Sequence, residues 1–198
     1  MLHYKIYEHS IVRDLKTFPK EICFMLDEKD MEEAPEKLYE IVSWVTGLPK
    51  IARIIFHISS SSPEKISIPK KADAFPENVE VTLSSPNGEN VLGRGAQKVL
   101  IVIGKCGTDE ICDAIVKIAK ENIEPEKIDE SVIESHLSYQ VNPDFVIKTG
   151  KSHLTDFLIW QSVYSELLFT DINWERFRRV DFLRALRDFE SRTRRFGK

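Results

Sequence analysis

Val99-Leu100-Ile101-Val102-Ile103 is an uninterrupted apolar run near the middle of the chain. A short run without polar alternation is typical of a central parallel strand that is covered on both faces. Outward from it, residues 22–26, 51–58 and 145–147 are further candidate strands, and residues 79–83 form a weaker one. We therefore predict a sheet whose innermost strands are buried.

Helical patterns separate these strands. Pro35 is well placed in the first turn of a helix that Gly47 closes. Thr108 or Asp109 can cap a later helix. Strands that alternate with helices predict βαβ units, and so an α/β fold with a central, mostly parallel sheet flanked by helices. We expect the helices at residues 4–12, 35–47, 108–118, 129–137, 154–168 and 182–195.

The chain has 198 residues, of which 42% are hydrophobic and 30% charged, and these values predict one globular domain over residues 1–198. Residues 59–98 are rich in Ser, Pro, Asn and Gly, so we expect them to be irregular around one edge strand. Residues 176–198 form a predicted basic helix and tail, with nine Arg and Lys against three Asp and Glu. This surplus suits either an anionic partner or a solvated helix face.

The composition also argues against several classes of protein. A net charge of -4 and the lack of a recognisable binding motif make nucleic acid a poor partner. The three cysteines form no paired CxxC knuckles, and their odd number does not suit a disulfide framework. No apolar run reaches the roughly 18 residues of a membrane span. We therefore expect a cytoplasmic protein with, at most, peripheral membrane contact.

The last third of the chain carries a specific set of motifs. Ile-Lys-Thr-Gly stands at 147–150, Phe-Leu-Ile-Trp-Gln at 157–161, Tyr-Ser-Glu-Leu at 164–167 and Arg-Phe-Gly at 195–197. The combination resembles the C-terminal signature of the cis-prenyltransferase family, and residues 19–27 are similar to the family's first strand. That family joins isopentenyl diphosphate to an allylic diphosphate with cis geometry, making undecaprenyl or dehydrodolichyl diphosphate. The resemblance implies an undecaprenyl diphosphate synthase-like fold.

The resemblance also implies roles for single residues. Asp27 matches the carboxylate that the family uses in catalysis and for the magnesium–diphosphate complex; the alternative is an Asp that ends a strand or caps a helix. Glu166 matches a family glutamate associated with metal or diphosphate. Lys148 stands where the family has the first of two arginines that grip isopentenyl diphosphate. The expected cofactor is Mg²⁺, bound through diphosphate in the complex, and the predicted substrate-binding residues are Ser59, Lys148, Arg195, Phe196 and Gly197.

Three departures from the family concern the diphosphates and the product. The family's Gly-Asn-Arg-Arg segment cradles the allylic diphosphate with backbone N–H groups and positive charge, and Glu28-Lys29-Asp30-Met31 replaces it here. The second arginine after Lys148 is missing, and a lysine cannot reproduce bidentate phosphate recognition. Residues 59–98 offer no pair of long amphipathic helices to wall a product tunnel.

These departures, together with the retained Arg-x-Gly at 195–197, resemble the Nogo-B receptor type of accessory subunit. We therefore predict a non-catalytic subunit of a heteromeric cis-prenyltransferase that makes long-chain polyprenyl diphosphate. The C-terminal motif would complete the isopentenyl diphosphate site of a catalytic partner in a heterodimer or heterotetramer. One alternative is a divergent homodimeric cis-prenyltransferase, active alone through Asp27, Lys148 and Glu166. The other is a scaffold that keeps the fold without prenyl chemistry.

Overall fold

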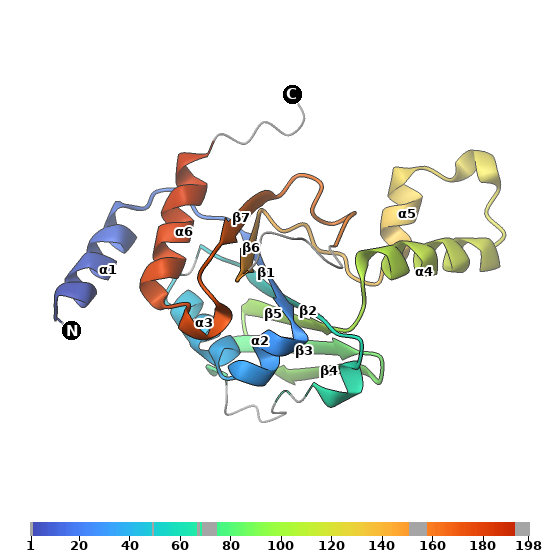
Figure 1. Cartoon of the computed structure of the whole chain (residues 1–198). Helices are drawn as coiled ribbons and strands as arrows, with labels where there is room; N and C mark the ends of the chain where they lie inside the picture. Colours follow the sequence, from blue (N-terminus) through green and yellow to red (C-terminus); the bar gives the residue numbers. More distant parts are fainter. Residues whose placement is uncertain (1, 49, 67, 69–74, 151–157, 193–198) are drawn as a thin grey trace.

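The computed structural model describes residues 2–48, 50–66, 68, 75–150 and 158–192 (Figure 1). Its strands form one seven-stranded sheet in the order β4-β3-β5-β2-β1-β6-β7. Every neighbouring pair is parallel except β3 and β4, which are antiparallel, and this confirms the predicted mostly parallel α/β sheet. The strands are β1 (Glu21–Asp27), β2 (Arg53–Ser59), β3 (Val79–Ser85), β4 (Gly88–Gly93), β5 (Gln97–Ile103), β6 (Phe145–Thr149) and β7 (Glu166–Thr170).

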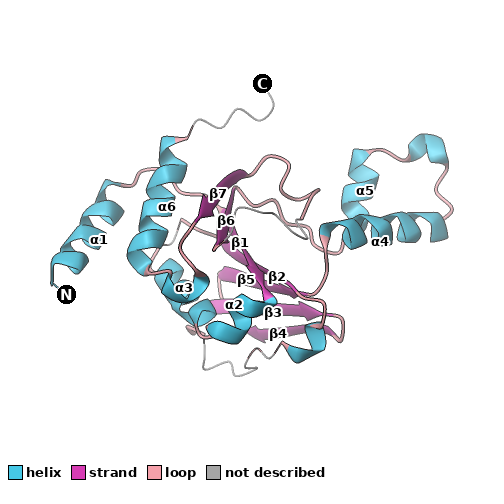
Figure 2. Ribbon diagram, in the orientation of Figure 1, coloured by secondary structure: helices cyan, strands magenta, loops and turns pink. Residues whose placement is uncertain are grey.

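Helices lie on one face and at one end of this sheet (Figure 2). In the part of the chain that the structure describes, no helix has the length and apolar character that crossing a bilayer requires. Short 3₁₀ turns at Pro63–Lys65, Pro125–Lys127 and Trp174–Arg176 complete the connections. The helices are α1 (Leu2–Asp14), α2 (Glu28–Glu33), α3 (Lys37–Thr46), α4 (Gly107–Lys120), α5 (Glu130–His136) and α6 (Arg179–Ser191).

The main core lies between the sheet and the helices α1, α3 and α6. The side chain of Phe24 is fully buried there, with its ring 5.5 Å from that of Phe56 and 6.1 Å from those of Trp174 and Phe177. Successive residues of a strand face opposite sides of a sheet, so the alternate residues of β1 build a second core on the other face. That smaller core consists of Cys23, Met25, Ile55, Val102, Tyr139, Val141, Val146 and Leu158.

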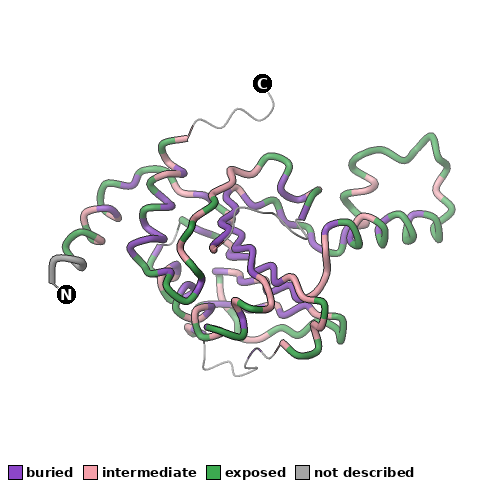
Figure 3. Tube along the Cα trace, viewed as in Figure 1, coloured by how far each residue is buried: buried purple, intermediate pink, exposed green. Residues whose placement is uncertain are grey.

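The cover of the second face is thinner than that of the first. It comes from the segment around Tyr139 and Val141 and from Leu158. In β5, Lys98 and Leu100 remain half-buried for this reason, whereas the inner residues of β1 and β2 are all buried. The pair α4 and α5 extends away from the sheet and is largely exposed (Figure 3).

Two predictions about single elements are wrong. A helix was predicted over 154–168; its first part, 154–157, lies outside the described residues, but residues 159–164 form turns and residues 166–170 form the edge strand β7. Residues 166–170 form a strand because all of them pair with β6. Strand formation depends strongly on the neighbouring strand against which a segment can pair. The segment 59–98 is less irregular than predicted, since it contains a hairpin of β3 and β4 as well as a 3₁₀ turn.

Candidate functional site

The candidate site lies where the parallel strands end. Asp27 is the last residue of β1, and it pairs in register with Ser59, the last residue of β2. In open α/β sheets, ligands bind at the carboxyl ends of the strands. A pocket of about 600 Å³ opens at this edge, lined by Asp27, Glu28, Lys29, Ser59, Ser60, Ser61, Gly104, Lys105, Cys106 and Asp109.

Asp27 both ends β1 and caps α2, as the alternative interpretation of this residue held. Its Oδ1 accepts a hydrogen bond of 3.0 Å from the backbone N–H of Asp30. In return, Oδ2 of Asp30 accepts a hydrogen bond of 3.0 Å from the backbone N–H of Asp27. This reciprocal capping fixes both carboxylates against the start of a six-residue helix.

Lys148 supplies the positive charge opposite these carboxylates. The residue is only 5% exposed on β6, and its Nζ lies 4.0 Å from Oδ2 of Asp27 and 3.9 Å from Oδ2 of Asp30. Burial raises the pKa of Asp30 to about 6, and the negative charge of Asp27 adds to the increase. One ammonium group therefore balances two neighbouring carboxylates inside the protein.

This arrangement is a poor site for a magnesium ion held by protein side chains alone. Mg²⁺ is usually bound by one or two carboxylates together with water and substrate phosphates. Here one oxygen of Asp27 and one of Asp30 accept the hydrogen bonds of the cap, and both carboxylates face the ammonium group of Lys148. Among the described residues, no group of three or more His, Cys, Asp or Glu side chains could hold a metal ion.

The pocket also disfavours a diphosphate. Its wall contains the carboxylates of Asp27, Glu28 and Asp109. Of the two lysines in the wall, Lys29 pairs with Glu33 of the same helix at 3.3 Å. Carboxylates repel phosphate, and a lysine that is already paired attracts it less.

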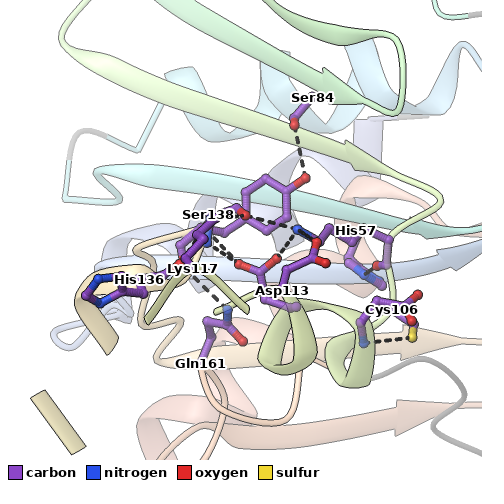
Figure 4. A network of polar contacts seen from close by, with 12 residues as sticks. His57, Ser84, Cys106, Asp113, Lys117, His136, Ser138 and Gln161 are labelled. Carbon is purple, nitrogen blue, oxygen red and sulfur yellow. Dashed lines mark hydrogen bonds and ion pairs between the residues drawn. The ribbon is translucent and has the colours of Figure 1, made fainter. Parts of the chain in front are cut away.

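Lys105, the other lysine in the wall, is tied into a network behind the pocket. Its Nζ lies 2.7 Å from a carboxylate oxygen of the buried Glu110 and 2.9 Å from one of Asp113. It also donates a hydrogen bond of 3.0 Å to Oγ of Ser138, which accepts another from Lys117 of α4 (Figure 4). The network joins the end of β5 to α4, and two carboxylates already balance the charge of this ammonium group.

The structure brings together only some of the residues predicted for the site. Asp27 and Ser59 line the pocket, and Lys148 lies behind it. Glu166 begins β7, so it lies at the amino ends of the parallel strands, whereas Asp27 lies at their carboxyl ends. Its carboxylate pairs with Arg192 at 3.4 Å. Within one chain, Glu166 therefore cannot share a metal ion with Asp27. Arg195, Phe196 and Gly197 lie outside the described residues.

The sequence analysis did not identify Lys105, Cys106 or Asp109 as site residues. All three line the pocket. The signal was their position directly after the predicted strand 99–103, because residues that follow parallel strands gather at one edge of a sheet.

The stability of the protein should rise when the pH falls from 7 to 5. The pKa of Asp30 is about 6 in the folded protein against an ordinary value of 3.8, so the folded state binds the extra proton. Protonation of Asp30 therefore adds to the free energy of unfolding below pH 6, and this contribution is lost as the pH rises above 6. Its size should be on the order of 1 kcal/mol, because the site is partly solvated. Urea unfolding at both pH values measures it. The same slope in Asp30→Asn would contradict the assignment.

Lys148→Met should lower the free energy of unfolding by about 2 kcal/mol at pH 8, because two carboxylates then lose their counter-charge. At pH 5 the loss should shrink, since protonated Asp30 needs no counter-charge. Urea unfolding at the two pH values provides the measurement. An equal loss at both would mean that Lys148 acts through packing alone.

Comparisons with known proteins agree with this fold. Residues 52–197 match a family model described as "Putative undecaprenyl diphosphate synthase". The chain resembles the structure of lavandulyl diphosphate synthase from Lavandula x intermedia, with a TM-score of 0.68, 19% identity and coverage of 91% of this chain and 99% of that one. For a probable undecaprenyl diphosphate synthase from Campylobacter jejuni, the TM-score is 0.64 at 18% identity, with coverage of 93% and 100%.

Two relatives are similar in sequence. The tritrans,polycis-undecaprenyl-diphosphate synthase (geranylgeranyl-diphosphate specific) of Methanocaldococcus jannaschii is 33% identical over 250 aligned positions, which cover 100% of this chain and 88% of that protein. The isoprenyl transferase of Deinococcus radiodurans is 41% identical over 140 positions, and the match covers 64% of this chain and half of that enzyme. The chain therefore belongs to the cis-prenyltransferase, or undecaprenyl diphosphate synthase, family.

Proposed function

We propose that the chain is a subunit of a heteromeric cis-prenyltransferase in which a catalytic homologue binds the diphosphates. The complex would condense isopentenyl diphosphate with an allylic diphosphate to give a long polyprenyl diphosphate. Magnesium would be bound in the partner's site rather than in this chain. The C-terminal Arg195 and Gly197 would complete the partner's isopentenyl diphosphate site, since a guanidinium group and a Gly N–H both suit phosphate.

The charge of the pocket is the observation that carries this proposal. Glu28 and Asp109 join Asp27 in its wall, and Lys29 and Lys105 are already paired with acidic residues. Two diphosphates would enter this space against net repulsion. A chain whose own pocket repels its substrates is better suited to support another chain's site.

The length of the chain adds support. The alignment with the archaeal relative runs over 250 positions, whereas this chain has 198 residues, so the relative carries additional residues inside the matched region. The described residues of segment 59–98 contain the hairpin of β3 and β4 but no α-helix. Without α-helices, these described residues have little means of enclosing a growing prenyl chain.

A divergent homodimeric cis-prenyltransferase, active alone, is the second candidate. The comparisons favour it, because the relatives named above carry the names of synthases and transferases. In a homodimer, Glu166 could reach the site of the neighbouring chain. The pocket's charge weighs against this candidate, and the relatives' names weigh for it, so the two need a direct test.

The test is to capture the tagged chain from its native host and identify its stoichiometric partners. Incorporation of labelled isopentenyl diphosphate is then measured for the chain alone and for the complex, with geranylgeranyl diphosphate as the allylic substrate. That choice follows the name of the archaeal relative. The proposal expects a second cis-prenyltransferase chain with an intact Asp-Gly-Asn-Arg-Arg segment, and activity only in the complex.

Asp27→Asn in this chain separates the two candidates within one assay. Asn caps a helix about as well as Asp, so α2 should keep its start. A non-catalytic subunit should leave the activity of the complex within about twofold of the wild type, whereas a homodimeric enzyme should lose roughly a hundredfold or more. Full activity of the pure chain, abolished by Asp27→Asn, would replace the proposal with the second candidate. No activity and no homologous partner would favour a scaffold.

A further inference from the structure

The outer side of α6 and the turn before it carry a row of arginines. Seven residues between 175 and 191 are exposed, and five of them are arginine; the other two are Glu175 and Ser191. The acidic residues nearby are paired: Asp181 is buried and pairs with Arg178 at 3.0 Å and with Arg184 at 3.6 Å. Glu8 of α1 pairs with Arg179 at 3.3 Å, and Asp188 pairs with Arg192 at 2.6 Å. Because one buried carboxylate serves two arginines, the surface keeps an excess of positive charge. The exposed arginines are Arg176, Arg178, Arg179, Arg184 and Arg187.

Exposed apolar groups on α1 adjoin this row. The helices α1 and α6 pack side by side (Figure 1). The guanidinium group of Arg184 lies 5.5 Å from the centre of the Tyr7 ring. Ile6, the residue before Tyr7, is 60% exposed. An isoleucine and a tyrosine therefore project into solvent beside a row of positive charges.

We propose that this α1–α6 surface, formed by Ile6, Tyr7 and the five exposed arginines of 176–187, binds an anionic lipid bilayer. Guanidinium groups attract the phosphates of anionic lipids, and a tyrosine ring is favourable at the level of the headgroups. An exposed isoleucine next to them gains by entering the acyl boundary.

The distribution of charge over the chain favours one orientation on such a surface. Residues 176–198 carry a surplus of positive charge, although the whole chain has a net charge of -4. A negative membrane therefore repels most of the protein and attracts this one end. The surface goes beyond the proposed function and does not depend on which chain catalyses. It would place the complex that makes water-insoluble polyprenyl diphosphates against the membrane that receives them.

The test is flotation of the full chain with vesicles of phosphatidylcholine, with and without phosphatidylglycerol. Binding is expected only with phosphatidylglycerol. Arg184→Gln with Arg187→Gln should lower the partition coefficient roughly 30-fold, since each arginine near an anionic surface contributes about fivefold. The matched control is Lys65→Gln with Arg94→Gln, which removes the same charge from exposed residues of segment 59–98.

Ile6→Ser distinguishes a bilayer from other acidic partners. It changes no charge, and it should lower vesicle binding several-fold because the apolar side chain no longer enters the membrane. Circular dichroism confirms that each variant is folded. No binding to phosphatidylglycerol vesicles would overturn the proposal. So would an equal loss in the Lys65 and Arg94 control, or unchanged binding by Ile6→Ser, which would indicate a general anion-binding or protein-binding surface.

Discussion

Arg195→Ala is expected to lower the activity of the heteromeric complex roughly a hundredfold while leaving its assembly intact. A guanidinium group can donate two parallel hydrogen bonds to a diphosphate, and removing such a charged donor costs about 3 kcal/mol of transition-state stabilisation. Steady-state incorporation of labelled isopentenyl diphosphate by the purified complex is the measurement.

Two further variants make this result specific. Arg195→Lys keeps the charge but loses the planar fork, so its activity should fall between those of the wild type and Arg195→Ala. Lys198→Ala removes a charge from the same tail outside the Arg-x-Gly motif, and it should have little effect. Size-exclusion chromatography checks that each complex remains assembled. Wild-type activity after removal of the last four residues would exclude a role for the tail in the partner's site.

Most of the sheet could be predicted from local patterns. β1, β2, β5 and β6 are short apolar runs between helical segments, and each lies within a residue or two of its predicted range. β4 was missed because its sequence, Gly-Glu-Asn-Val-Leu-Gly, is polar at both ends. Pro86-Asn87-Gly88 was a usable signal, since Pro, Asn and Gly favour tight turns. Pro86 and Asn87 form the loop between the paired residues Ser85 and Gly88, and Gly88 adopts a φ of 116°.

β7 could not be predicted in the same way. The apolar and aromatic residues around 166–170 also fit helical spacing, and a short run does not distinguish the two periods. The exposed edge of β6 decided the outcome, and that edge exists only in the folded sheet. Tertiary pairing thus overrode the local pattern.

The site was only partly predictable for a similar reason. That Asp27 and Ser59 meet follows from parallel strands ending at one edge of the sheet. The pairing of Lys148 with Asp30 does not follow, because it depends on how α2 turns back after its cap. The structure thereby changes the meaning of Lys148. This lysine faces two carboxylates in the folded chain, and its role in binding substrate stays a prediction.

Glu110→Ala is expected to lower the free energy of unfolding by about 4 kcal/mol, a large fraction of the stability of a domain of this size. The Glu110 side chain is 1% exposed, and its Oε1 accepts hydrogen bonds from the backbone N–H groups of Ser138 and Tyr139. Alanine would leave both donors unpaired and remove a partner of Lys105. Urea unfolding at pH 7 measures the loss.

The loss of these hydrogen bonds should also loosen the core on the second face of the sheet. Tyr139 belongs to that core, and its hydroxyl group forms a hydrogen bond of 3.0 Å with Oγ of Ser84. Glu110→Gln keeps an acceptor for the two N–H groups, so it should cost less than alanine. Asp113→Asn, whose carboxylate is 57% exposed and bonds the same Lys105, should cost less than about 1 kcal/mol. If Asp113→Asn cost as much as Glu110→Ala, the charge of Lys105 rather than the buried backbone contacts would hold this segment in place.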